Sequence, residues 1–242
     1  MLKVTNETPE DAVSGLRPRE RNKLDKLRRI KAAARELFLE QGYDNATTRE
    51  IARRADVGLG TLFSYASDKR DLLFLIYNDM QEALTRTAFS GSRSSRTFLG
   101  QVMASFGVYY RFFAREPEFM RYVLRELTFY SSGRQSDRFQ TGREAIIAAL
   151  ELLVRDAKKR RALRSSAKDR AIAQLIFGVY QAEIRRWLTG AHPKPAAGLA
   201  RLRTMLRIVI EGLKPGQQVI GSGAILLKPF IVQALQADKG RS

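Results

Sequence analysis

The stretch from Asn45 to Lys69, NATTREIARRADVGLGTLFSYASDK, decides the fold of the N-terminal part of the chain. Thr47 is a good N-cap with a glutamate three residues later, a capping box that predicts a helix from Thr48 to Ala55. Gly58 supplies backbone freedom for a turn, and a second short helix is expected from Leu59 to Ser64. Two short helices joined by so tight a turn indicate a helix-turn-helix.

In a helix-turn-helix the second helix lies in the DNA major groove, and its first residues reach the base edges. A plain helical hairpin whose aromatic residues belong to the core is the alternative interpretation of the same pattern. Lys69 opens the next helix, where it could meet a phosphate. The candidates for DNA contact are Thr47, Thr48, Leu59, Gly60, Thr61, Phe63, Ser64, Tyr65 and Lys69.

The order and spacing of residues around this motif favour DNA binding over the plain hairpin. The residues concerned are Ile30, Ala33, Ala34, Leu37, Phe38, Gln41, Gly42, Tyr43, Thr47, Thr48, Arg49, Glu50, Ile51, Ala52, Ala55, Val57, Gly60, Thr61, Leu62, Phe63, Tyr65, Asp68 and Lys69. On these residues, the segment from about Arg21 to Met80 resembles the DNA-binding domain of the TetR family of transcriptional regulators. The resemblance implies an operator-binding head, usually of a repressor, and a larger helical domain that binds a small effector.

The composition excludes several classes of protein. The 242 residues include no Cys and a single His, His192, which leaves no thiolate zinc site and little for a His-based triad. Nucleophile-elbow, Walker and dinucleotide-binding motifs are absent as well, so we expect no enzyme, no metal and no cofactor. The N-terminus lacks an apolar signal segment, and no apolar run reaches the roughly 20 residues of a membrane helix. We therefore expect a cytoplasmic protein without a membrane partner.

The formal net charge of +18 favours a polyanionic partner. Residues 1–70 carry 15 Lys and Arg against 11 Asp and Glu, whereas residues 134–214 carry 18 against 7. Most of the positive excess therefore lies outside the helix-turn-helix, either as a solvated basic surface or with an electrostatic role of its own. This charge keeps a second function open, that of a non-specific basic nucleic-acid-binding protein.

Apolar stripes at helical spacing predict helix after helix and no strand in the main body, hence an all-α fold with a three-helix head and a larger helical domain. The expected domains are a disordered arm over 1–20, the DNA-binding domain over 21–80, a ligand-binding and dimerisation domain over 81–215, and a tail over 216–242. Helices are expected over 21–41, 69–89, 97–115, 117–129, 137–162, 168–188 and 196–213. Gly42 should end the first of these helices, and Asp68 should cap the second.

Residues 97–130 are unusually aromatic. One helix buries only one stripe, so some of these rings face a second layer or a cavity suited to an apolar or aromatic molecule. Ordinary core packing is the alternative for each single residue. With the resemblance, a ligand pocket is expected among the helices, and its candidate residues are Phe106, Tyr109, Tyr110, Phe113, Tyr122, Phe177 and Tyr180.

The last helix carries an apolar stripe of Leu199, Leu202, Leu206, Val209 and Leu213. In the resembling family the last two main helices form a four-helix bundle across a two-fold axis, so we expect a homodimer through 168–188 and 196–213. Arg203 and Arg207 would lie at the rim, where Glu183 or Glu211 of the other chain offsets their repulsion. The alternative is that this stripe faces only its own core.

Overall fold

A computed structural model describes residues 17–90, 95 and 97–212, and within these residues the chain is helical with no strand. The elements are α2 Pro18–Glu40, α3 Thr48–Arg54, α4 Leu59–Tyr65, α5 Lys69–Ser90, α6 Phe98–Phe113, α7 Pro117–Glu126, the 3₁₀ turn η2 Leu127–Phe129, α8 Ser136–Lys159, α9 Asp169–Leu188 and α10 Pro195–Gly212. The all-α prediction is confirmed. The predicted arm up to residue 16, Leu213 and the tail over 216–242 lie outside the described residues.

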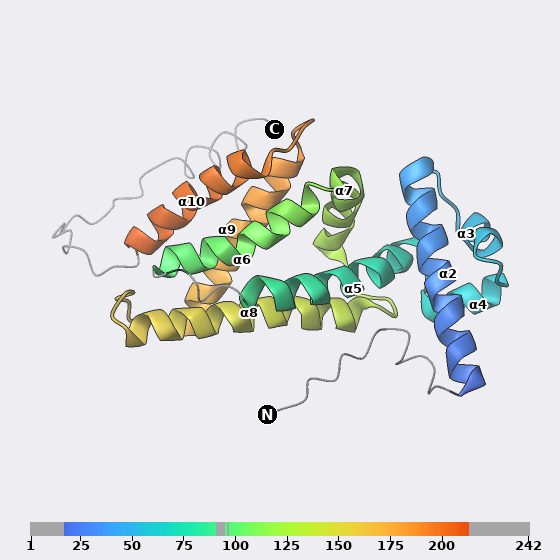
Figure 1. Ribbon diagram of the computed structural model, residues 1–242, viewed down its shortest axis with the longest axis horizontal. Coiled ribbons are helices and arrows are strands. Elements are labelled where there is room, and N and C mark those ends of the chain that lie inside the picture. Colours follow the sequence, from blue (N-terminus) through green and yellow to red (C-terminus); the bar gives the residue numbers. More distant parts are fainter. Residues whose placement is uncertain (1–16, 91–94, 96, 213–242) are drawn as a thin grey trace, which may run out of the picture.

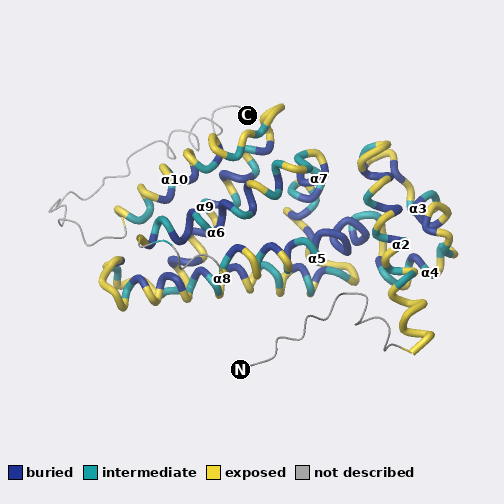
Figure 2. The backbone as a smooth tube through the Cα atoms, viewed as in Figure 1, coloured by how far each residue is buried: buried dark blue, intermediate teal, exposed yellow. Residues whose placement is uncertain are grey.

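The helices form a small head and an elongated body (Figure 1). The head consists of α2, α3 and α4 and lies at one end of the molecule, while α5, α6, α8, α9 and α10 pack together in the body, where α9 crosses α8 at a steep angle. The short helix α7 packs on α9 of the body and also contacts α2 of the head. Figure 2 shows that buried residues line the sides on which these helices face one another.

The first and last residues of some helices differ from the predicted limits, because residues with strong capping preferences set the helix ends. α2 begins at Pro18, three residues before the predicted start, because proline is suited to the first helical position. The basic residues from Arg17 to Arg21 therefore stand at the first turn of α2 and not in an irregular arm. Gly42 follows the end of α2 with a φ of +81°, as predicted for a residue just past a helix.

Helix α6 is the centre of the body. Phe106, Tyr109, Tyr110 and Phe113 are all buried, because α6 packs against α5, α8 and α10 at once. This is why the helix carries aromatic residues in several directions around its axis. Ordinary packing therefore accounts for much of the aromatic content of residues 97–130.

Helix α5 belongs to the head and to the body. Every residue from Asp71 to Asn78 is buried, since this part of α5 contacts α2 of the head as well as α7 and α8 of the body. The predicted domain boundary after residue 80 falls inside this unbroken helix, and the domain limits stay a prediction.

The predicted dimer stripe on α10 is partly wrong. Leu202 and Leu206 have no exposed surface, because they pack inward where α10 contacts α6 and α9 of the same chain. Glu183, expected at the rim of a dimer, instead accepts a hydrogen bond from Arg201 of its own chain at 2.8 Å and is almost fully buried. Leu202, Leu206 and Glu183 therefore contribute to the fold of one chain.

Two classes of site are absent from the part of the chain that the structure describes. None of its helices combines the length and the apolar character needed to span a membrane. Its His, Cys, Asp and Glu side chains form no group of three or more that could hold a metal ion.

Candidate nucleic-acid interface and effector cavity

The turn between α3 and α4 is built on Asp56. Asp56 has a φ of +49°, whereas Gly58 has an ordinary φ of −65°, so the prediction that Gly58 supplies the special conformation is wrong. Aspartate tolerates the left-handed region better than most residues. Arg29 of α2 holds the turn, because its Nη1 donates to the Ala55 carbonyl at 2.8 Å and to the Asp56 carboxylate at 3.0 Å.

The predicted N-cap of α3 is present, but only half of the capping box forms. The Thr47 hydroxyl accepts a hydrogen bond from the Glu50 backbone N–H at 3.2 Å. The Glu50 carboxylate does not return the bond; it accepts from Gln41 Nε2 at 2.9 Å, which fixes α3 to the end of α2. Ile51 of α3 and Leu62 of α4 are fully buried beneath these contacts, so the opposite faces of both helices remain at the surface.

All nine candidate DNA residues keep some exposure. Thr47, Gly60 and Ser64 are exposed, and Thr48, Leu59, Thr61, Phe63, Tyr65 and Lys69 are partly buried. A methyl group added at Gly60 would meet no atom within 4 Å. The start of α4 therefore has an open surface that another backbone or a base edge could approach closely.

Besides Thr47, three of these residues have side chains with partners in the head. The Tyr65 hydroxyl donates to the Lys23 carbonyl at 3.1 Å and ties α4 to α2. Ser64 Oγ donates within its own helix to the Thr61 carbonyl at 2.6 Å. Lys69 Nζ donates to the Asp44 carbonyl at 2.9 Å. An ammonium group has three donors, so Lys69 keeps capacity for a phosphate.

The sequence interpretation missed two basic residues on α3. Arg49 and Arg53 are exposed, and within the described residues neither side chain has a hydrogen-bond or ion-pair partner. They lie one helical turn apart, on the face opposite the buried Ile51 and Ala52. Two arginines four residues apart, on the side of the helix away from its apolar residues, already indicated in the sequence that α3 has a basic surface.

The body contains a cavity between α5, α6, α7, α8 and α9. Four of the predicted pocket residues line it: Tyr109, Phe113, Phe177 and Tyr180. The other lining residues, which the sequence interpretation did not select, are Tyr77, Gln81, Leu124, Leu127, Phe139, Arg143, Ile146, Gln181, Ile184 and Arg185.

The remaining three predicted pocket residues lie elsewhere. Phe106 stacks on the ring of Tyr180 at 4.1 Å between centroids. Tyr110 packs against Trp187, 4.8 Å between centroids, and α10 covers it. Tyr122 stacks on Tyr43 of the head at 5.8 Å. These rings stabilise the packing around the cavity or join α7 to the head, and they do not line the cavity.

The cavity wall is mainly aromatic and aliphatic, with two glutamines and two arginines among its lining residues. Burial raises the pKa of Tyr109 to about 12, against a hydrogen bond with Thr85 that lowers it, so this phenol stays neutral at ordinary pH. Gln81 Oε1, Arg143 Nε and Arg185 Nε are buried without a hydrogen-bond partner. Among the described residues the lining contains no Asp or Glu. The cavity therefore combines neutral aromatic surface with two arginines that no carboxylate of the lining pairs, and the Arg143 guanidinium lies over the Phe177 ring, 5.9 Å from its centroid.

The cavity is narrow in this conformation. It has about 30 Å³ of room for water-sized molecules, whereas pockets that hold drug-sized ligands measure about 300–1,000 Å³. An organic ligand therefore enters only if the lining side chains or helices move apart.

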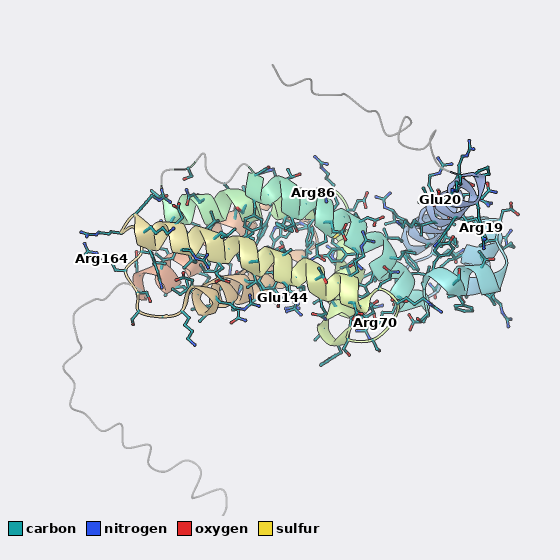
Figure 3. The ribbon with its side chains drawn as sticks, turned by 90° about the horizontal axis from the view of Figure 1, so that it is seen from below. Arg19, Glu20, Arg70, Arg86, Glu144 and Arg164 are labelled. Carbon is teal, nitrogen blue, oxygen red and sulfur yellow. The ribbon has the colours of Figure 1, made fainter. Side chains whose placement is uncertain are left out.

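Helix α7 connects this cavity with the head. Its Leu124 lines the cavity, and the next residue, Arg125, forms two hydrogen bonds with the Asp44 carboxylate of the head, at 2.7 and 3.0 Å. Arg125 lowers the pKa of Asp44, chiefly through these bonds. Arg70 adds a contact at the same junction, because its Nε donates to the Glu126 carbonyl at 3.1 Å; Figure 3 labels Arg70 between the two ends of the molecule.

A buried carboxylate at the start of α5 holds the head and the body together. Asp71 is 1% exposed and accepts hydrogen bonds from the Ser67 N–H of the head at 2.7 Å and from the Arg134 and Gln135 N–H groups of the body, both at 2.9 Å. The Tyr130 hydroxyl donates a further bond. The head is thus fixed to the segment that leads into α8.

The comparisons with known proteins locate the similarity in the head. The family model described as bacterial regulatory proteins, tetR family, matches residues 30–76. The HTH-type transcriptional regulator HbdR of Aromatoleum sp. (strain CIB) is 50% identical over 46 residues, 19% of this chain and 20% of that protein. Residues 30–76 match the TetR family. The curated relatives are matched over 20% and 35% of their own lengths.

Solved structures extend the likeness to the fold of the body. FadR of Thermus thermophilus, a TetR-family repressor in complex with lauroyl-CoA, superposes with a TM-score of 0.61 at 23% identity, over 81% of this chain and all of that one. FadR of Bacillus subtilis, in complex with stearoyl-CoA, gives 0.61 at 17% identity over 76% and 97% of the two chains. At these identities the similarity is one of fold.

Proposed function

We propose that this TetR-family protein is a sequence-specific DNA-binding transcriptional regulator, a repressor that a small apolar or aromatic ligand releases from its operator. The observation that carries the proposal is a helix-turn-helix whose open face is joined, through α7 and the Asp71 contacts, to an aromatic cavity in the body. A change at the cavity can alter the position of the head only through such contacts.

The open surface at Gly60 supports insertion of α4 into the major groove, and the exposed Arg49 and Arg53 supply phosphate contacts beside it. The effector class is supported by the aromatic lining of the cavity. The acyl-CoA ligands of the two similar FadR structures have a long apolar part, which suits such a lining.

A homodimer through α9 and α10 is part of the proposal, with its contact residues revised. Leu175 on α9 and Ile208 on α10 are among the large apolar side chains that stay exposed in one chain, at 47% and 60%, and the surface at Gly178 is open. A second copy packed on this face would bury them and place two heads on a palindromic site.

A gel shift on the DNA upstream of the protein's own gene, with random DNA of equal length as the control, tests the proposal. Retention of the upstream fragment at a salt concentration that frees the random fragment is the expected result. Equal retention of both fragments would favour the alternative, a non-specific basic nucleic-acid-binding protein.

A further inference from the structure

A more open hollow adjoins this cavity on the surface between α7 and α9. Arg121, Leu124, Arg125, Arg185, Leu188 and Thr189 line about 420 Å³ of space there. Leu124 and Arg185 also line the cavity, so the two spaces share one wall. A ligand that reaches the cavity past this wall would keep one end in the hollow.

The hollow is lined by three arginines and, within the described residues, by no Asp or Glu. The Arg185 side chain has no hydrogen-bond or ion-pair partner there, and its Nε is buried. Arg121 donates to the carbonyls of Leu188 and Gly190, both at 2.8 Å, so neutral acceptors hold it and its charge is not paired. A buried donor on a cation without an acceptor is costly unless a ligand supplies one.

We propose that the effector is an anionic amphiphile whose phosphate or carboxylate head binds in this hollow against Arg185 and Arg121, while its apolar body enters the aromatic cavity past Leu124. This rests on the proposed function for the role of the cavity, and it adds the charge of the ligand and the place of its head. Guanidinium groups bind carboxylates and phosphates through paired hydrogen bonds, which suits arginines at the mouth of an apolar space.

The same hollow explains how such a ligand acts on the head. Arg125 lines the hollow and holds the Asp44 carboxylate of the head. An anion in the hollow competes with Asp44 for this guanidinium. The head loses one attachment to α7 as the ligand binds, and an uncharged analogue of the same chain length lacks this effect.

Titration of the full-length protein with lauroyl-CoA, laurate and dodecanol tests the proposal, followed by calorimetry and by the fluorescence of Trp187, the single tryptophan. At least one of the two anions should bind about ten-fold or more tightly than the alcohol, as expected for hydrogen bonds to a charged group. The two anions separate a phosphate-bearing from a carboxylate head.

Arg185→Gln should remove most of this preference, and Arg185→Lys should retain part of it. Arg186→Gln is the matched control, because Arg186 is exposed on the same helix and lines neither space. If a variant fails to fold by circular dichroism, Arg121→Gln takes its place.

Three results would overturn the proposal: equal affinity for all three probes, no binding of any of them, or a preference that Arg143→Gln abolishes and Arg185→Gln does not. The last would place the head inside the cavity instead of the hollow. DNA binding is measured separately. Charge-selective binding without any effect on DNA would refute the proposed function alone, while release of DNA by dodecanol as readily as by the anions would refute this inference alone.

Discussion

Replacement of Asp71 by asparagine should weaken the junction between head and body severely. Each carboxylate oxygen of Asp71 accepts two hydrogen bonds, Oδ1 from Tyr130 and Gln135 and Oδ2 from Ser67 and Arg134. An asparagine amide keeps one acceptor and turns its NH₂ group toward two donors. With about 1.5–3 kcal/mol for each lost hydrogen bond to a charged group, the expected loss of unfolding free energy is about 3–6 kcal/mol.

Urea denaturation followed by far-ultraviolet circular dichroism measures this loss, which is large beside the roughly 5–15 kcal/mol stability of a typical protein. Gly133→Ala should also lower the unfolding free energy, because the φ of Gly133 is +124° and an added Cβ would lie 2.7 Å from Asp71 Oδ1. The control is Asp156→Asn, whose partner is the exposed Arg160 just past the end of α8; the loss of this surface ion pair costs about 1 kcal/mol or less. An Asp71→Asn protein as stable as this control would refute the reasoning.

Three further predictions concern DNA, assembly and pH. Thr61→Ala should weaken operator binding with unchanged circular dichroism, and Lys69→Ala should weaken all DNA equally and lower the salt slope by about one unit in a filter-binding assay. Ile208→Glu should give folded monomers in sedimentation equilibrium, since this side chain is exposed in one chain. Burial raises the pKa of Asp79, but hydrogen bonds and charge from Lys31 and Arg138 together lower this pKa below its ordinary value. The unfolded state then binds more protons, so stability should be full above about pH 4 and fall below it in acid titrations of the urea midpoint.

The sequence predicted the helices of the head well, because capping and turn residues act locally. Thr47 caps α3, Asp68 accepts a hydrogen bond from the Asp71 N–H at 2.7 Å at the start of α5, and Gly42 ends α2. The left-handed residue was misassigned to Gly58, because the choice of Asp56 depends on Arg29, which is distant in sequence.

The cavity was harder to predict, because aromatic spacing does not show which face of a helix meets a second layer. Tyr109 and Phe113 line the cavity while Phe106 and Tyr110, on the same helix, pack behind it. Arg143 offered a better signal, since it interrupts the apolar stripe of α8 between Phe139 and Ile146. Leu206 shows the opposite problem: a stripe at coiled-coil spacing serves the core of one chain as well as it serves a dimer.

Coupling between the cavity and the DNA is the central claim, and a thermodynamic cycle measures it directly. The affinity of the protein for lauroyl-CoA, the probe named above, is measured with and without the duplex that it binds most tightly in a selection from random DNA. Because coupling is reciprocal, that duplex should weaken lauroyl-CoA binding by the factor by which lauroyl-CoA weakens DNA binding. An affinity for lauroyl-CoA that is the same with and without the duplex would contradict the account.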